Sequence, residues 1–194
     1  MIPENYFIDN LALINRFSHI EGSVVECGVW RGGMIAAIAE LLGNDRKYFL
    51  FDSFEGLPQV KEIDGESAKA WQLDTQSAWY HNNCTAEKEY AERAMQLSGV
   101  VNYKINQGWF NATLPAFNVS QSIAILRLDG DWYDSTMDCF RYLYPSVAPG
   151  GLVIIDDYYA WDGCSRAVHD YLSMHSLTAR IHQYNDSLCF IIKK

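Results

Sequence analysis

The chain has 194 residues, 49% of them hydrophobic, and a formal net charge of −9 at pH 7. This length and composition fit one globular domain, residues 1–194, and the acidic balance argues against nucleic acid or an anionic membrane as a partner. The five cysteines form no CxxC pair, and no apolar run reaches about eighteen residues, so we expect a reduced, soluble, cytoplasmic protein.

Predicted helices and strands alternate along the chain. Apolar residues at three- and four-residue spacings predict a helix over 5–19, within an N-terminal helical lead-in, 1–21. Short β-branched runs then alternate with helical patterns, which is typical of a parallel sheet covered on both faces. Strands are expected at 23–28, 48–52, 100–105, 122–128 and 152–156, and helices at 32–43, 86–98, 134–147 and 163–175.

Two further extended runs, 178–183 and 187–193, follow the last predicted helix. The link between them is too short for a crossover helix, so these strands must be antiparallel neighbours. The predicted fold class is therefore α/β, with a doubly wound mixed sheet that is parallel except for a C-terminal antiparallel strand. The segment 59–85 has mixed polarity and two tryptophans, and we expect it to form an excursion over the active-site edge of the sheet.

The first predicted strand ends in ECGVWRGG, residues 26–33, and leads directly into a helix. Glycine at such a turn lets the backbone approach a ligand closely, a role that suits Gly28 and Gly32. Glu26 precedes the turn, where its carboxylate could accept a hydrogen bond from a cationic amino group. A purely structural turn explains the loop equally well, and its spacing is not the G-x-G-x-x-G of dinucleotide sites.

The next two strands add a candidate nucleoside site. Asp52 lies at the tip of the second strand, followed by Ser53, and an acid there can accept hydrogen bonds from both ribose hydroxyls. The alternative is that Asp52 caps the following turn. The third strand leads to Gln107, Gly108 and Trp109, where the adenine would lie, and the Trp109 ring could stack on the base or belong to the core.

Four carboxylates follow the fourth and fifth predicted strands, Asp129 and Asp131 after one and Asp156 and Asp157 after the other. These strands should be neighbours, so the acids meet at one rim beside the cofactor pocket and would repel each other unless they shared a cation. Mg²⁺ prefers oxygen ligands and keeps waters, which fits this set. If a substrate hydroxyl binds the ion, a carboxylate can take its proton as the oxygen attacks the methyl carbon of a sulfonium, and Asp131 is the candidate base.

The motifs VVECGVWRGG, FDSFEGLP, GWFNATLP, LRLDGDWYDSTMD and PGGLVIIDDY together resemble the macrocin O-methyltransferase family, whose members methylate sugar hydroxyls on macrolide and aminocoumarin antibiotics. The resemblance implies the seven-stranded class I methyltransferase sheet and S-adenosylmethionine as cofactor. It also implies Mg²⁺ on Asp129, Asp156 and Asp157, with Asp129 beside the cofactor as well. It places Asp131 at the position of the general base and Asp52 at that of the ribose-binding acid.

Several alternatives stay open. The expected partner is a small-molecule acceptor with hydroxyl groups, a sugar or glycoside, but a catechol-type phenol would suit the same metal site. A nicotinamide-dependent oxidoreductase is disfavoured by the missing glycine motif, and a non-catalytic S-adenosylmethionine-binding module would not need four acids. The region before the first strand is shorter than is usual in the family, so the site could stay open for a bulky glycoside, or the lid could be the 59–85 excursion or a second subunit of a homo-oligomer.

Overall fold

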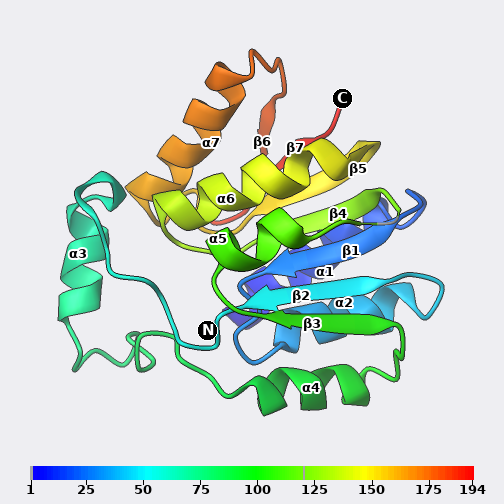
Figure 1. Cartoon of the computed structure of the whole chain (residues 1–194), viewed down its shortest axis with the longest axis horizontal. Helices are drawn as coiled ribbons and strands as arrows, with labels where there is room; N and C mark the ends of the chain where they lie inside the picture. The colour runs from blue at the N-terminus through cyan, green and yellow to red at the C-terminus, as the bar shows by residue number, and fades with distance from the viewer. Residues whose placement is uncertain (1, 120) are drawn as a thin grey trace.

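The computed structural model describes residues 2–119 and 121–194, so Met1 of the predicted lead-in lies outside the described residues. A seven-stranded sheet with helices on both faces forms its centre (Figure 1). The predicted α/β class is confirmed. The strands are β1 (Ser23–Cys27), β2 (Tyr48–Asp52), β3 (Tyr103–Gln107), β4 (Ile123–Leu128), β5 (Val147–Ile155), β6 (Ile181–Gln183) and β7 (Cys189–Ile192).

The strands lie in the order β3-β2-β1-β4-β5-β7-β6. Neighbours from β3 to β5 are parallel, whereas β7 runs antiparallel to both β5 and β6. The predicted antiparallel pair at the C-terminal end of the sheet is therefore confirmed. The order reverses between β1 and β4, and the carboxyl ends of strands at such a switch point are where open α/β sheets bind ligands.

The helices form two layers, one on each face of the sheet (Figure 1). One layer contains α1 (Glu4–Arg16), α2 (Gly33–Leu42) and α4 (Lys88–Leu97), and the other contains α5 (Phe110–Thr113), α6 (Tyr133–Leu143) and α7 (Asp162–Met174). Val24 packs against the first layer and Val25 against the second, as the alternation of side chains along a strand requires. No helix among the described residues is long and apolar enough to cross a membrane.

The excursion over 59–85 contains two elements that the sequence patterns did not indicate, the short 3₁₀ helix η1 (Glu62–Asp64) and the helix α3 (Glu66–Leu73). α3 lies beyond the carboxyl ends of the parallel strands (Figure 1). The Asp64 carboxylate accepts a hydrogen bond from the backbone N–H of Tyr133 at 2.7 Å, and the Trp132 indole donates to the carbonyl of Pro58 at 3.0 Å. These bonds anchor the excursion to the beginning of α6.

Several predicted boundaries are wrong. The first helix ends at Arg16 and not at residue 19, β5 begins at Val147 and not at residue 152, and β6 begins at Ile181 and not at residue 178. β3 begins at Tyr103 and not at residue 100, because Val101 is exposed and its N–H donates to the Asn44 side chain in the preceding connection. The helix expected to reach 147 ends at Leu143, where a 3₁₀ turn containing Pro145 leads into β5. Proline lacks the N–H that an α-helix interior needs, so it favours this earlier end.

Packing against β4 should dominate the stability of the fold. Leu126 of β4 is fully buried, whereas Leu97 at the end of α4 is 70% exposed. We expect Leu126→Ala to lower the free energy of unfolding by about 2–5 kcal/mol, because it removes buried apolar surface and leaves a cavity. Leu97→Ala should change it by less than about 0.5 kcal/mol. Urea denaturation followed by circular dichroism measures both, and equal losses would contradict the central place of β4.

Candidate functional site

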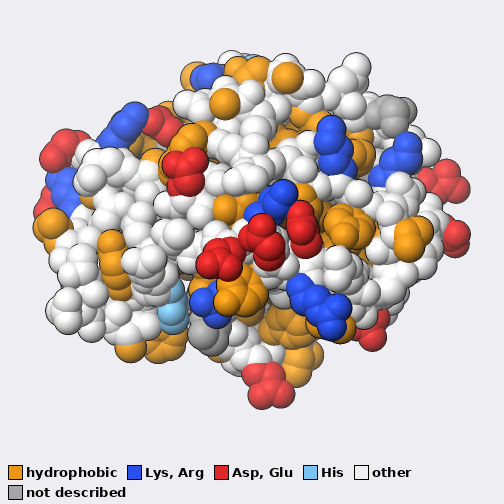
Figure 2. Space-filling model, turned by 60° about the horizontal axis from the view of Figure 1, so that its bottom comes forward, with side chains coloured by type: hydrophobic (Ala, Val, Ile, Leu, Met, Phe, Trp, Pro, Cys, Tyr) orange, Lys and Arg blue, Asp and Glu red, His pale blue; other side chains and the backbone are white. Residues whose placement is uncertain are grey.

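A cavity of about 960 Å³ opens at the carboxyl ends of the parallel strands. Of the predicted site residues, those that line it are Glu26, Gly28, Asp52, Ser53, Trp109, Asp129, Asp131, Asp156 and Asp157. Gly32, Gln107 and Gly108 are not among its lining residues. On the face seen in Figure 2, Lys and Arg side chains are scattered and form no continuous patch.

The predicted glycines differ in their roles. At Gly28, φ is +85° and a Cβ atom would lie 1.6 Å from the Asp129 carbonyl oxygen, so only glycine lets the ends of β1 and β4 approach this closely. At Gly32, φ is +77° and a Cβ atom would lie 2.8 Å from the Cα of Ala91. Gly32 therefore allows α2 to pack on α4, behind the cavity wall. The Gly108 N–H donates to the backbone carbonyl of Asp52 at 2.9 Å.

The Asp52 carboxylate holds the backbone of two loops at the cavity wall. Its Oδ2 accepts a hydrogen bond from the N–H of Trp30 and its Oδ1 one from the N–H of Phe54, both at 2.7 Å. This is the turn-binding role that was the alternative for Asp52, yet each oxygen keeps a lone pair for a ligand hydroxyl. Burial raises the pKa of Asp52, although these backbone bonds oppose the shift. The Ser53 hydroxyl accepts a bond from the Glu55 N–H at 3.0 Å and completes the turn.

A buried arginine connects the cofactor strand to the acidic rim. Arg127 is 2% exposed, and its Nη1 donates to Glu26 Oε1 and Asp129 Oδ2 at 2.7 Å. Its Nη2 pairs with Asp156 Oδ1, also at 2.7 Å, and its Nε donates to Asn10 Oδ1 of α1 at 3.4 Å. Burial alone would lower the pKa of Arg127, but the carboxylates around it raise it. The guanidinium is therefore charged and neutralised within the protein interior.

The second oxygen of Glu26 has no such partner. Glu26 is 1% exposed, and its Oε2 is buried without a hydrogen bond to any of the described residues. Burial raises the pKa of this carboxyl to about 7, against the lowering effect of Arg127. A buried acceptor without a partner costs free energy. Since Glu26 lines the cavity, a cationic donor bound there would supply the missing hydrogen bond.

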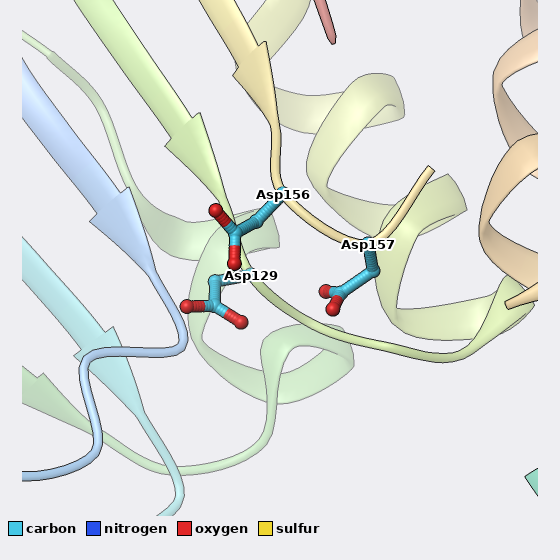
Figure 3. Close-up of side chains that lie close together, drawn as sticks. All are labelled: Asp129, Asp156 and Asp157. Atoms are coloured by element: carbon cyan, nitrogen blue, oxygen red, sulfur yellow. The ribbon is translucent and has the colours of Figure 1, made fainter. Parts of the chain in front are cut away.

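Three aspartates turn their carboxylates toward one another at the ends of β4 and β5 (Figure 3). One oxygen from each of Asp129, Asp156 and Asp157 lies within 4.8 Å of the others. Arg127 binds one oxygen of Asp129 and one of Asp156, and the Asp131 N–H donates to Asp157 Oδ2 at 3.0 Å. In the described part of the chain, no hydrogen bond engages the other oxygen of these three carboxylates. The expected proximity is thus present, while metal binding stays a prediction.

Negative charge exceeds positive charge in this part of the cavity. The carboxyls of Glu26, Asp129, Asp131, Asp156 and Asp157 line it together, and Arg127 pairs with three of them, Glu26, Asp129 and Asp156. Burial, with a contribution from neighbouring carboxylates, raises the pKa of Asp131 to about 7 and that of Asp156 to about 6. The pKa of Asp157 is raised by the same causes. A divalent cation would stabilise the ionised form of the whole group.

A cluster of indole rings stands beside Asp131. The Trp161 Nε1–H donates to Asp131 Oδ1 at 2.9 Å. The Trp161 ring packs edge-to-face on Trp132 and Trp71, with centroid separations of 5.3 and 6.1 Å. Trp71 belongs to α3, so the 59–85 excursion contributes a ring to this cluster.

Sequence patterns missed Arg127, Asn10 and Trp161. Arg127 was detectable in principle, because an arginine inside an apolar strand that is covered on both faces needs a buried anionic partner. Asn10 lies in α1, whose residues Tyr6 and Phe7 also line the cavity, so the N-terminal helix forms part of the wall. No local pattern indicates the approach of α1 or of Trp161, because both depend on how distant segments pack.

Comparison with known proteins identifies relatives of this chain. Residues 9–194 match the family model described as macrocin-O-methyltransferase (TylF). The chain is 34% identical over 179 residues to 8-demethyl-8-(2,3-dimethoxy-alpha-L-rhamnosyl)-tetracenomycin-C 4'-O-methyltransferase of Streptomyces olivaceus, covering 88% of this chain and 66% of that protein. It is 35% identical over 162 residues to demethyldecarbamoylnovobiocin O-methyltransferase of Streptomyces niveus, covering 79% of this chain and 59% of that protein. The chain thus spans less than two thirds of the length of these curated relatives.

A solved structure agrees with these matches. The O-methyltransferase NovP superposes with a TM-score of 0.81 at 28% sequence identity, and the alignment covers 96% of this chain and 80% of NovP. The strand order of this sheet and the superposition on NovP confirm the class I methyltransferase fold that the sequence motifs implied. Because the family model matches nearly the whole chain, this protein belongs to the macrocin O-methyltransferase family.

Proposed function

We propose that this protein transfers a methyl group from S-adenosylmethionine to a hydroxyl of a small molecule, a sugar or glycoside, with Mg²⁺ at the acidic rim. The observation that carries the proposal is the Arg127 bridge, which joins Glu26 to Asp129 and Asp156 within one cavity. Membership of the macrocin O-methyltransferase family supports the reaction type and argues against the oxidoreductase alternative. One curated relative is named for a rhamnosyl-bearing acceptor, which supports the glycoside class.

The residues at the ends of β1, β2 and β3 suit the cofactor. The buried Oε2 of Glu26 would accept a hydrogen bond from the amino group of the methionine part. The Asp52 carboxylate, fixed by two backbone N–H groups, would accept hydrogen bonds from the ribose hydroxyls. Gly28 keeps this wall free of a side chain, and the half-buried Trp109 ring is available to the adenine. The residues with these roles follow one another along the sheet edge, from β1 to β3, in the order in which an extended nucleoside would cross it.

The acidic rim fits a hard divalent cation. One carboxylate oxygen from each of Asp129, Asp156 and Asp157 lies within 4.8 Å of the others, and Mg²⁺ commonly combines a few carboxylates with waters and substrate oxygens. Arg127 binds one oxygen of Asp129 and one of Asp156, which leaves the other oxygen of each carboxylate without a hydrogen bond to the described residues. When bound, the ion would make a neighbouring acceptor hydroxyl more acidic.

Asp131 is placed to accept the proton of the acceptor hydroxyl. Its Oδ1 is engaged by Trp161, and among the described residues no hydrogen bond engages its Oδ2. As the acceptor oxygen bonds to the methyl carbon, the carbon–sulfur bond breaks, which yields a methyl ether and S-adenosylhomocysteine, and the proton passes to Asp131. Burial raises the pKa of Asp131 to about 7, and a bound cation would lower it and favour the ionised form that accepts the proton. The cavity walls contribute by aligning donor and acceptor.

Cofactor binding is the first test. Calorimetric titration with S-adenosylhomocysteine, with and without MgCl₂, should show micromolar binding. Glu26→Gln should weaken it by roughly ten- to a hundredfold, because a charge-assisted hydrogen bond to the amino group is lost while the amide oxygen can still accept from Arg127. The absence of binding to the unaltered protein in both conditions would contradict the proposed cofactor.

The excess of buried carboxylates predicts how stability depends on pH. Burial raises the pKa values of Glu26, Asp131 and Asp156 to about 7, 7 and 6, above the value of about 4 in an unfolded chain. The folded protein therefore binds more protons between about pH 4.5 and 7, so its free energy of unfolding in EDTA should fall as the pH rises through this range. MgCl₂ should reduce the fall, because the cation binds ionised carboxylates. Urea denaturation at several pH values measures both effects, and a stability in EDTA that rises with pH would count against them.

The proposed base has its own test. Asp131→Asn keeps a residue type that tolerates the left-handed φ of +58° at this position. We expect turnover to fall by about a hundredfold or more while S-adenosylhomocysteine binds as before, because only the proton acceptor is lost. The acceptors are methyl α-L-rhamnoside, demethyldecarbamoylnovobiocin and catechol, which separate glycosides from phenols. EDTA should abolish turnover of the unaltered protein. Full activity of Asp131→Asn would refute the assignment of the base.

A further inference from the structure

We infer that Trp161 is a positioning residue for Asp131, and that its indole N–H holds one carboxylate oxygen so that the other faces the acceptor. This role rests on the proposed function, because it concerns the base of that reaction. It is carried by the geometry of the indole cluster, Trp71, Trp132 and Trp161, and of the loop after β4.

The backbone of Asp131 is fixed independently of its side chain. Its φ of +58° lies in the left-handed region, and its N–H donates to Asp157 Oδ2 at 3.0 Å. These constraints determine where the Cβ atom lies but leave the carboxylate free to rotate, since the terminal torsion of aspartate is broad. The bond from Trp161 Nε1 to Oδ1 at 2.9 Å is the contact that sets this rotation.

Trp161 is itself held rigidly. Its backbone N–H donates to the carbonyl of Asp157 at 3.0 Å, and the residue caps the N-terminus of α7. Its ring meets Trp132 at an interplanar angle of 70° and Trp71 at 64°, the edge-to-face arrangement that aromatic pairs favour. A donor whose backbone and ring are both fixed can hold a carboxylate in one orientation. A mobile donor would move together with the carboxylate and would not restrain it.

The three indoles differ in what their N–H groups bind. Trp132 donates to the carbonyl of Pro58 at 3.0 Å, and Trp71 to the carbonyl of Trp79 at 3.3 Å. In both bonds, an indole side chain donates to a backbone carbonyl of another segment. Trp161 alone among the three donates to a carboxylate that lines the cavity. A ring needed only for packing would not require a carboxylate acceptor. The bond from the Trp161 N–H to Asp131 therefore indicates a role in orienting that carboxylate.

Matched variants separate positioning from packing. Trp161→Phe keeps an aromatic ring and removes the N–H, and Trp132→Phe does the same to a buried indole whose bond goes to a backbone carbonyl. With methyl α-L-rhamnoside as acceptor, we expect Trp161→Phe to lower kcat by roughly ten- to a hundredfold and to leave KM and the affinity for S-adenosylhomocysteine unchanged. Trp132→Phe keeps the bond from Trp161 to Asp131, so it should lower the melting temperature and reduce kcat by much less than Trp161→Phe does. Equal kcat values for Trp161→Phe and the unaltered protein, or equal losses in both variants, would overturn the role.

If Trp161→Phe does not fold, a closer replacement is available. Incorporation of β-(3-benzothienyl)alanine at position 161 keeps the bicyclic ring and puts sulfur where the N–H was. The same substitution at position 132 is the control. The expected split between kcat and KM is the same as for the phenylalanine variants, and its absence would overturn the positioning role.

A spectroscopic measurement tests the contact without any acceptor. Asp131→Gly removes the carboxylate at a position whose left-handed φ suits glycine. In ¹H–¹⁵N spectra, the indole N–H resonance of Trp161 should move upfield, because it loses a charged acceptor, while that of Trp132 stays in place. An unmoved Trp161 resonance would overturn the inference. Turnover by Asp131→Asn would instead refute the proposed base, so the two failures are distinguishable.

Discussion

The charge of Arg127 is the constraint on which the site depends. A guanidinium buried to 2% exposure must be paired, and its partners come from three different strand ends: Glu26 in β1, Asp129 after β4 and Asp156 after β5. The cost of burying these charges is offset only if all of them stay together. The pairing therefore holds the carboxyl ends of three neighbouring strands in one arrangement, and it orients the two sides of the cavity relative to each other.

This arrangement has a consequence for binding. Arg127 engages one oxygen of each partner, so Glu26 Oε2 and the second oxygens of Asp129 and Asp156 have no hydrogen bond to the described residues. The cationic groups of two ligands can then bind these oxygens while Arg127 keeps its own contacts with the same carboxylates. Because the same guanidinium touches Glu26 as well as Asp129 and Asp156, the electrostatic environment of the proposed amino-group site and that of the proposed metal site are linked through one residue.

Much of the fold follows from local patterns, because strands buried on both faces have near-continuous apolar sequences and a three-residue link forces an antiparallel pair. The gathering of Asp129, Asp156 and Asp157 was predictable for the same reason, since all three follow strands that end at one edge. The helix α3 was not predictable, because its sequence is polar. Its place is set by tertiary contacts such as the bond from the Tyr133 N–H, at the start of α6, to Asp64. Sequence patterns likewise put Gly32 in the cofactor site, whereas its conformation serves the packing of α2 on α4.

The residues that escaped prediction share a physical cause. Asn10 and Trp161 reach the site from α1 and the start of α7, elements that surround the sheet edge without belonging to it. A strand end places a side chain by topology alone, so its position can be derived from the order of elements. A helix or loop packed over that edge places its side chains through tertiary contacts, which no local periodicity encodes. The acids that bear the charge are therefore readable in the sequence, and the groups that orient them become visible only in the folded chain.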